Sequence, residues 1–203
     1  LFSDQKQILK NILIKNKSLS SNFKLNILKE LSNSSNISSK LKIKDASINS
    51  KEIKKDSVFF AIKGENKDGN LFVKEAFAKG ASLAIVSNQK KSKKKIVVKN
   101  TLKLLTKASS ILRENLSSKI ISITGSCGKT SLKELIARSL NKTNQVTCSP
   151  KSFNNKFGVP LSLFNLKKND EFGVFEIGMD KKGEIDFLSK IIKPDVGVIT
   201  NIS

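Results

Sequence analysis

Residues 120–131 read IISITGSCGKTS, and this stretch decides the fold of the chain. A short apolar run, typical of a buried strand, is followed by a turn with two glycines and then by the start of a helix. In that context the N–H groups of the turn and of the helix N-terminus converge on phosphate oxygens. Lys129 offers a positive charge to the β- and γ-phosphates, and the Thr130 hydroxyl can ligate Mg²⁺. The sequence therefore predicts a site for ATP and Mg²⁺.

The turn is a shortened form of the phosphate-loop pattern, because two residues rather than four separate its glycines. The candidate nucleotide-binding residues are Gly125, Ser126, Cys127, Gly128, Lys129, Thr130 and Ser131. Lys129 and Thr130 are also candidate catalytic residues. Since Cys127 lies at a helix N-terminus beside Lys129, we expect alkylation of Cys127 to be faster than that of Cys148 and to be slowed by ATP.

On the carboxyl side of the turn, strand patterns alternate with helical patterns. Helices are predicted at 131–140, 159–166 and 183–192, and strands at 145–148, 173–177 and 196–200. This alternation indicates an α/β fold with a parallel sheet and crossover helices. Because the chain stops at Ser203, before such a sheet is normally complete, we expect residues 117–203 to form a truncated ATP-binding domain.

A smaller α/β domain is predicted at residues 41–116. Its strands are expected at 46–49, 58–62, 83–86 and 96–98, and its helices at 71–79 and 102–116, with a turn at 64–69. The first of these helices is expected to bury Phe72, Ala76 and Phe77 on one face and to end at Gly80. Residues 1–40 are a polar lead-in with short helices expected at 5–14 and 22–31.

The formal charge of +21 suits a polyanionic partner such as nucleic acid. However, Arg113 and Arg138 are the only arginines, and the chain has no Tyr or Trp for stacking on bases. A composition rich in Lys, Asn, Ile and Ser is also typical of AT-rich genomes. We therefore expect the lysine-rich stretch 90–95 to be a solvated loop and no specific nucleic acid to bind, with a basic nucleic-acid-binding NTPase as the alternative.

Several site classes are excluded by the residues that the chain lacks. It has no histidine, which excludes Ser-His-Asp and Cys-His catalytic sets and histidine-ligated metals. Its two cysteines have neither zinc nor disulfide spacing, which indicates a reducing compartment. No apolar run approaches the roughly 20 residues of a membrane span, and no secretory signal begins the chain. We expect a cytoplasmic protein without membrane insertion; the missing initiator methionine indicates a piece of a longer chain.

Two further polar features follow strands or precede a helix. Glu176 ends the predicted strand 173–177, at the sheet edge where ligands bind, and it is either a second Mg²⁺ ligand with a catalytic role or a partly exposed strand-end acid. Asn154 and Asn155 precede the helix at 159–166. They form either a plain capping turn or a contact to a polar substrate.

Taken together, these motifs resemble the Mur ligase family. The resemblance rests on ITGSCGKTS at 123–131, FNN at 153–155 with GVPL at 158–161, EIG at 176–178, GEI at 183–185 and TNI at 200–202. Upstream, SINSK at 47–51, VFFAIKGE at 58–65, DGN at 68–70 and GA at 80–81 resemble the uridine-nucleotide domain of that family. The Asn-Asn-x-x-Gly-Val-Pro segment is similar to the MurF type rather than to the MurE type.

The resemblance implies a set of substrate contacts. They are Ser50, Lys51, Lys63, Asp68, Asn70, Asn154 and Asn155. Asn49 and Lys51 replace the family's usual Asp and Arg, and Asn70 replaces a common His. Lys51 keeps the positive charge but loses the planar fork of an arginine. The uridine-diphosphate contacts are therefore expected to differ from those of the family.

The implied activity is that of a ligase of peptidoglycan precursor synthesis. ATP would phosphorylate the carboxylate of UDP-N-acetylmuramoyl-tripeptide, and D-alanyl-D-alanine would attack the acyl phosphate to form an amide. The family's remaining Mg²⁺ ligands, its carbamylated lysine and its carboxy-terminal domain would lie beyond Ser203, so the 203 residues are not expected to turn over alone. The alternatives within the superfamily are a MurE-type amino-acid-adding ligase and a folylpolyglutamate-type synthetase. The segment LFSD at 1–4, with Ile8 and Leu9, is similar to the closing segment of MurE-type ligases. This resemblance implies a MurE-type tail at residues 1–15 and a chain that straddles a MurE–MurF fusion.

Overall fold

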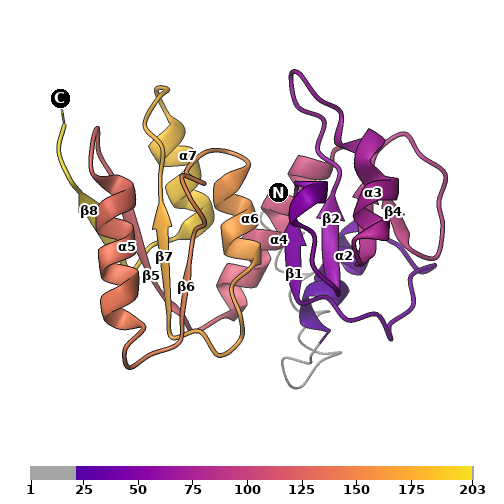
Figure 1. Cartoon of the computed structure of the whole chain (residues 1–203), viewed down its shortest axis with the longest axis horizontal. Helices are drawn as coiled ribbons and strands as arrows, with labels where there is room; N and C mark the ends of the chain where they lie inside the picture. Colours follow the sequence, from indigo (N-terminus) through magenta and orange to yellow (C-terminus); the bar gives the residue numbers. More distant parts are fainter. Residues whose placement is uncertain (1–21, 203) are drawn as a thin grey trace. The chain divides into compact units, whose positions relative to one another are not determined.

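The structure, a computed structural model, describes residues 22–202, which form two compact units divided between Ile111 and Leu112 (Figure 1). The predicted helix at 5–14 and the MurE-like segment at 1–15 lie outside the described residues. The predicted domain limits, 41–116 and 117–203, stay predictions. Within residues 22–202, none of the helices combines the length and the apolar character that crossing a membrane requires.

The first unit contains one parallel sheet with the strand order β1-β2-β3-β4. Its elements are α2 (Phe23–Ser32), β1 (Asp45–Ser47), the 3-10 turn η1 (Ser50–Glu52), β2 (Ser57–Phe60), the 3-10 turn η2 (Gly69–Phe72), α3 (Val73–Ala78), β3 (Ala81–Val86), β4 (Lys95–Val97) and the start of α4 (Thr101–Asn115). Each predicted strand of this unit is present, with its ends shifted by at most two residues.

The core of the first unit lies between the sheet and α3. Phe59 on β2 and Ala84 and Val86 on β3 pack with Val73 and Ala76 of α3. All four residues of β2 are buried, as expected for a central strand that is covered on both faces. This packing fixes the carboxyl ends of β1 and β2, from which the loops at 48–52 and 61–69 leave the sheet.

One helix prediction in this unit was wrong at its start. Residues 69–72 form the 3-10 turn η2, which Asp68 caps by accepting a hydrogen bond from the Asn70 N–H, and the α-helix begins only at Val73. Phe72 therefore precedes the first α-helical turn and is 36% exposed instead of joining the buried face. Gly80, with φ of 105°, ends the helix as predicted, because this left-handed backbone favours glycine.

The second unit also contains one parallel sheet, with the strand order β6-β7-β5-β8. Its elements are β5 (Lys119–Thr124), α5 (Lys129–Leu140), β6 (Val146–Cys148), α6 (Gly158–Phe164), β7 (Phe172–Glu176), α7 (Glu184–Ile192) and β8 (Val196–Ile199). This parallel α/β architecture, and the alternation of strands and helices that predicted it, are confirmed.

The strand order creates a crevice at the carboxyl ends of β5 and β7. The connection after β5 passes β7 to reach β6, whereas the connections after β6 and β7 run back in the opposite direction. Right-handed crossovers therefore place α5 on one face of the sheet and α6 and α7 on the other (Figure 1). Where the direction reverses, the loops after neighbouring strands part, and ligands bind at such points in open α/β sheets. Here these loops follow Thr124 and Glu176.

Arg113, in the second unit, contacts the segment at the end of α7. Its guanidinium donates to the carbonyls of Ile192 (2.9 Å) and Lys193 (2.9 Å) and pairs with Asp195 at 2.9 Å. The Ile120 N–H donates to the same Asp195 carboxylate, and this hydrogen bond is the main reason that the pKa of Asp195 is lowered. The planar fork thus satisfies several carbonyls at the end of α7 at once, which a lysine cannot do.

Replacing Arg113 with lysine is expected to lower the free energy of unfolding by about 1 to 2 kcal/mol, because the carbonyls of Ile192 and Lys193 lose their shared donor. Urea denaturation followed by circular dichroism would measure the change. Arg138→Lys is the matched control, since the Arg138 side chain is 80% exposed and pairs with Glu134 on the surface. We expect its effect to be below about 0.5 kcal/mol. Equal losses in the two variants would contradict the role of Arg113.

Candidate functional site

The glycine-rich turn is held against the end of β8. The Ser126 N–H donates to the Asn201 carbonyl (3.0 Å), and the Cys127 N–H donates to the Asn201 side-chain oxygen (2.9 Å). The Thr200 hydroxyl donates to the Cys127 carbonyl at 2.6 Å. Gly125 has φ of 134°, and a Cβ atom there would collide with the Thr200 hydroxyl and the Asn201 backbone. The turn can therefore follow this path only with glycine at position 125.

Lys129 begins α5, directly after Gly128, whose φ is 78°. Its ammonium group folds back over the turn and donates to the carbonyls of Gly125 (2.5 Å) and Ser126 (3.3 Å). A cation placed over the turn at a helix N-terminus is the arrangement that binds the phosphates of a nucleotide. In this structure the charge is satisfied by the chain's own carbonyls.

A pocket of about 420 Å³ opens above the turn. It is lined by Ser126, Gly128, Lys129, Thr130, Ser131, Ser152, Asn154 and Glu176. Five of the seven predicted nucleotide-binding residues thus share one pocket with Glu176; the two others are Gly125, which is buried beneath the turn, and Cys127, which is exposed. The lining is mostly polar, as a site for a charged ligand requires.

Glu176 ends β7 and is completely buried, so the alternative of a partly exposed strand-end acid is wrong. Lys133, on the next turn of α5 after Lys129, places its ammonium nitrogen 2.9 Å from Oε1 of Glu176 and is 1% exposed. The sequence reasoning missed Lys133. Its spacing of four residues from Lys129 puts both lysines on one face of α5, and that spacing is the signal that could have identified it.

The residues around this pocket fit a magnesium ion. Neither carboxylate oxygen of Glu176 receives a well-formed hydrogen bond from residues 22–202, although both are buried. Mg²⁺ prefers oxygen ligands and is usually held by one or two protein groups together with substrate phosphates. Glu176 and the Thr130 hydroxyl supply such a pair. An all-protein metal cage is not part of this range, in which no three His, Cys, Asp or Glu residues gather.

The structure separates the two asparagines before α6. The Asn155 side-chain oxygen accepts hydrogen bonds from the N–H groups of Phe157 (3.0 Å) and Gly158 (3.0 Å), which is the plain capping role. Asn154 lines the pocket instead, and its carbonyl accepts from the Gly178 N–H at 2.6 Å. Of the pair, only Asn154 lies where it can meet a ligand in the pocket.

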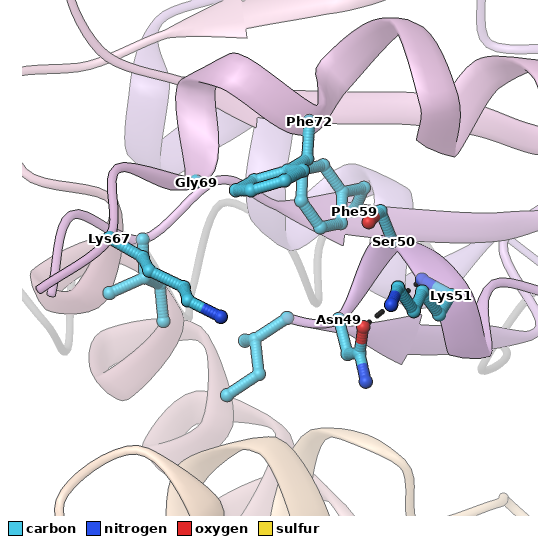
Figure 2. A pocket seen from close by; sticks show the side chains of 9 residues that line it. Asn49, Ser50, Lys51, Phe59, Lys67, Gly69 and Phe72 are labelled. Carbon is cyan, nitrogen blue, oxygen red and sulfur yellow. Dashed lines mark hydrogen bonds between the residues drawn. The ribbon is translucent and has the colours of Figure 1, made fainter.

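A second pocket, of about 310 Å³, lies in the first unit at the carboxyl ends of β1 and β2. It is lined by Ile48, Asn49, Ser50, Lys51, Phe59, Ile62, Lys67, Gly69 and Phe72. Figure 2 shows the rings of Phe59 and Phe72 on one wall, with the Lys67 ammonium group reaching toward the open space. The Asn49 side-chain oxygen accepts from the Lys51 N–H (3.1 Å) and so shapes the loop between β1 and η1. An aromatic wall beside a cation suits a base with attached phosphates.

The predicted substrate residues divide between this pocket and a structural network. Ser50 and Lys51 line the pocket, but the Ser50 hydroxyl is also committed to the Glu75 carboxylate at 2.8 Å. Lys63, Asp68 and Asn70 are not among the lining residues. Asp68 accepts from the backbone and side-chain amides of Asn70, which lower its pKa. The sequence reasoning missed Lys67 and Phe72 as pocket residues: it placed Lys67 in the turn at 64–69 and Phe72 on the apolar face of the helix predicted at 71–79.

Asn70 ties the η2 turn to the end of β3. Its side chain accepts from the Ser87 N–H at 2.9 Å and donates to the Ser87 hydroxyl at 3.0 Å.

The lysine-rich stretch after β3 is exposed from 90 to 94, and the ammonium group of Lys95, the first residue of β4, donates to the Gln89 side chain. The prediction of a solvated loop there is confirmed.

Two family models match the chain, and they follow one another along it. The Mur ligase family catalytic domain matches residues 42–115, and the Mur ligase middle domain matches residues 123–203. The chain belongs to the Mur ligase family. The first match contains the pocket beside Phe72, and the second contains the glycine-rich turn and Glu176.

Curated relatives of this Mur ligase chain include two bacterial proteins named UDP-N-acetylmuramoyl-tripeptide–D-alanyl-D-alanine ligase. The protein of Rickettsia prowazekii is 39% identical over 170 residues, which make up 82% of this chain and 38% of the relative. That of Bacillus subtilis is 36% identical over 156 residues, 75% of this chain and 34% of the relative. The chain therefore spans little more than a third of the length of these relatives.

Solved structures of similar Mur ligases agree with the fold. MurF from Acinetobacter baumannii matches with a TM-score of 0.69 and 33% identity, over 81% of this chain and 37% of that one. MurF from Thermotoga maritima, solved in complex with ADP, matches with a TM-score of 0.64 and 34% identity, over 78% of this chain and 37% of that one. The resemblance to the MurF type drawn from the sequence is confirmed.

Gly125→Ala is expected to lower the free energy of unfolding of this Mur ligase chain by about 2 kcal/mol or more, because the new methyl group meets Thr200 and Asn201 and the backbone there is suited to glycine. Gly128→Ala is the matched control. Its φ is also positive, but nothing lies within 4 Å of the added atom, so we expect a loss of about 1 kcal/mol. Thermal or urea unfolding measures both, and a larger loss in the control would contradict this account.

The two cysteines are expected to react with iodoacetamide at different rates. Cys127 is exposed, whereas Cys148 is half-buried and its burial raises the pKa of its thiol. Cys127 should therefore be alkylated several-fold faster at pH 7.5. Mass spectrometry of the labelled peptides over time measures the two rates. Equal rates would show that exposure does not control reactivity here.

Proposed function

We propose that this chain supplies the nucleotide-binding part of an ATP-dependent ligase that joins D-alanyl-D-alanine to UDP-N-acetylmuramoyl-tripeptide in peptidoglycan precursor synthesis. The observation that carries the proposal is the shared pocket of Lys129, Thr130, Asn154 and Glu176, at the sheet edge where α/β proteins bind nucleotides. The names of the relatives support the choice of substrates. The resemblance of the asparagine segment before α6 to the MurF type supports the same choice.

In this proposal each residue of the pocket has one task. The N–H groups of the turn and the Lys129 ammonium group bind the triphosphate, and Thr130 and Glu176 ligate Mg²⁺. When bound, Mg²⁺ neutralises charge on the phosphates during phosphoryl transfer. Lys129 leaves the carbonyls of Gly125 and Ser126 to meet the β- and γ-phosphates. Catalysis then rests on positioning and on neutralisation of charge, since phosphoryl transfer needs little else from the protein.

The reaction that we propose has two steps. A carboxylate oxygen of the tripeptide attacks the γ-phosphorus, which yields an acyl phosphate and ADP. The amine of D-alanyl-D-alanine then attacks the carbonyl carbon, and inorganic phosphate leaves as the amide forms. Asn154 lies beside Glu176 in the lining of the pocket, and its amide can both donate to and accept from a polar substrate.

We propose that the pocket of the first unit receives the uridine nucleotide. The rings of Phe59 and Phe72 offer an apolar wall for the base, and Lys51 and Lys67 offer charge for the diphosphate. Both cysteines are free, which suits the reducing cytoplasm, where nucleotide-linked substrates of this kind are available. The lysines of 90–94 lie on an exposed loop and are not needed for either pocket.

A chimera tests the proposal. Residues 42–203 of this chain would replace the aligned segment of the Rickettsia prowazekii relative, and amide formation would be measured by mass spectrometry with ATP, UDP-N-acetylmuramoyl-tripeptide and D-alanyl-D-alanine. We expect turnover, and we expect Lys129→Met to lower it by about 100-fold or more because a phosphate contact is lost. Lys142→Met, just after α5 and exposed, is the matched control and should leave turnover unchanged.

The chimera also separates the two halves of the proposal. A folded chimera that binds ATP but forms no amide with D-alanyl-D-alanine would contradict the proposed reaction. Amide formation with single amino acids instead would favour the MurE-type alternative. If ATP does not slow the alkylation of Cys127 in the chimera, that result would contradict the placement of the nucleotide at the turn.

A further inference from the structure

The ion pair between Lys133 and Glu176 is buried at the edge of the pocket that is proposed to bind ATP. The side chains are 1% and 0% exposed, and the ammonium nitrogen lies 2.9 Å from Oε1 of Glu176. Glu176 lines the pocket, whereas Lys133 does not. Taking two charges out of water is costly, so a pair of this kind is poor evidence for stability alone. Its place next to the proposed metal ligand needs another explanation.

Lys133 also contacts the turn at 151–154, which contributes Ser152 and Asn154 to the lining of the pocket. Its ammonium group donates to the Lys151 carbonyl at 2.5 Å. Lys151 has a left-handed backbone, with φ of 48°, and it directly precedes Ser152, which lines the pocket together with Asn154. A single ammonium group therefore joins the carboxylate at the end of β7 to the turn after β6.

Other contacts of Glu176 do not fix its carboxylate. The Glu176 N–H donates to the Ser149 hydroxyl at 3.4 Å, which holds the backbone and not the side chain. Neither carboxylate oxygen receives a well-formed hydrogen bond from residues 22–202. The ion pair with Lys133 through Oε1 is therefore the main restraint on the carboxylate among residues 22–202, and Oε2 is buried without a hydrogen-bond partner there.

We propose that Lys133 is a positioning residue for the magnesium–nucleotide complex. It holds Glu176 through one oxygen, so that the other is presented to the cation, and it fixes the turn at 151–154 at the same time. This inference rests on the proposed function, because it takes Glu176 as a ligand of the bound Mg²⁺. Partners that orient a metal ligand typically change metal affinity by about 10- to 100-fold when they are removed.

Binding of ATP to the full chain, measured by calorimetry with Mg²⁺ and with EDTA, tests the inference. Lys133→Met removes the ammonium group and keeps most of the volume of the side chain. We expect it to weaken the Mg²⁺-dependent binding by about 10-fold or more and to leave the binding of metal-free ATP unchanged. Lys133→Gln, which keeps an N–H donor, should lose less. Lys142→Met is the control and should bind as the wild-type chain does.

A double variant separates positioning from a general effect on folding. Glu176→Gln should remove most of the advantage that Mg²⁺ gives, and adding Lys133→Met to it should cause no further loss, because the two act through one contact. Lys133→Met leaves the buried Glu176 carboxylate without its partner, which can prevent folding. In that case Lys133→Gln and the double variant carry the test. Circular dichroism identifies the folded variants.

Three results would overturn the inference. The first is a folded Lys133 variant that binds ATP with Mg²⁺ as tightly as the wild-type chain or more tightly. The second is an equal loss with and without the metal, which would indicate a merely structural role. The third is an additive loss in the double variant. A wild-type chain that binds no ATP in the presence of Mg²⁺ would instead overturn the proposed function and this inference together, so the two failures are distinguishable.

Discussion

The backbone path between Thr124 and Lys129 is the constraint on which the second unit depends. β5 is the strand from which the chain departs toward one edge of the sheet, and β7 is where it departs toward the other, so the crevice lies directly above this path. Gly125 allows the turn to pass against Thr200 and Asn201, and Gly128 allows α5 to begin at once. Four strands and three helices are thereby arranged around one short turn.

Sequence patterns predicted the α/β fold well because both sheets are parallel and their strands are short apolar runs. Val58, Phe59 and Phe60 are buried side by side, and no other element explains such a run so simply. The errors lie where a polar side chain moves a helix boundary. Asp68 caps a 3-10 turn that delays α3, and Phe72 consequently points out of the core; periodicity alone carries no information about that cap.

The candidate site could be predicted only as far as its residues are adjacent in the sequence. The turn from Gly125 to Ser131 is contiguous and was recognisable, and Glu176 followed from the rule that ligands bind at the carboxyl ends of strands. The spacing of Lys133 from Lys129 places it on the same face of α5, but its pairing with Glu176 could not be predicted, because Glu176 is 43 residues away and meets it only after α5 packs beside β7. Asn155 is a different case. It is part of the recognisable motif, but its side chain caps the start of α6 through a local hydrogen bond and does not line the pocket.

The chain itself supplies hydrogen-bond partners for the polar groups of the glycine-rich turn. Asn201 accepts hydrogen bonds from two N–H groups of the turn, and Lys129 donates to two of its carbonyls. The oxygens of Asn201 and of these carbonyls thus occupy the donors that the proposed function assigns to phosphate oxygens. In the function proposed for this chain, nucleotide binding would exchange these partners for phosphate oxygens, and its net free energy would be the difference between two sets of hydrogen bonds. The residue that follows β8 by two positions, Asn201, would then compete with the phosphates for the N–H groups of the turn, so the position of residues 200–201 would affect how readily a nucleotide is accepted or released.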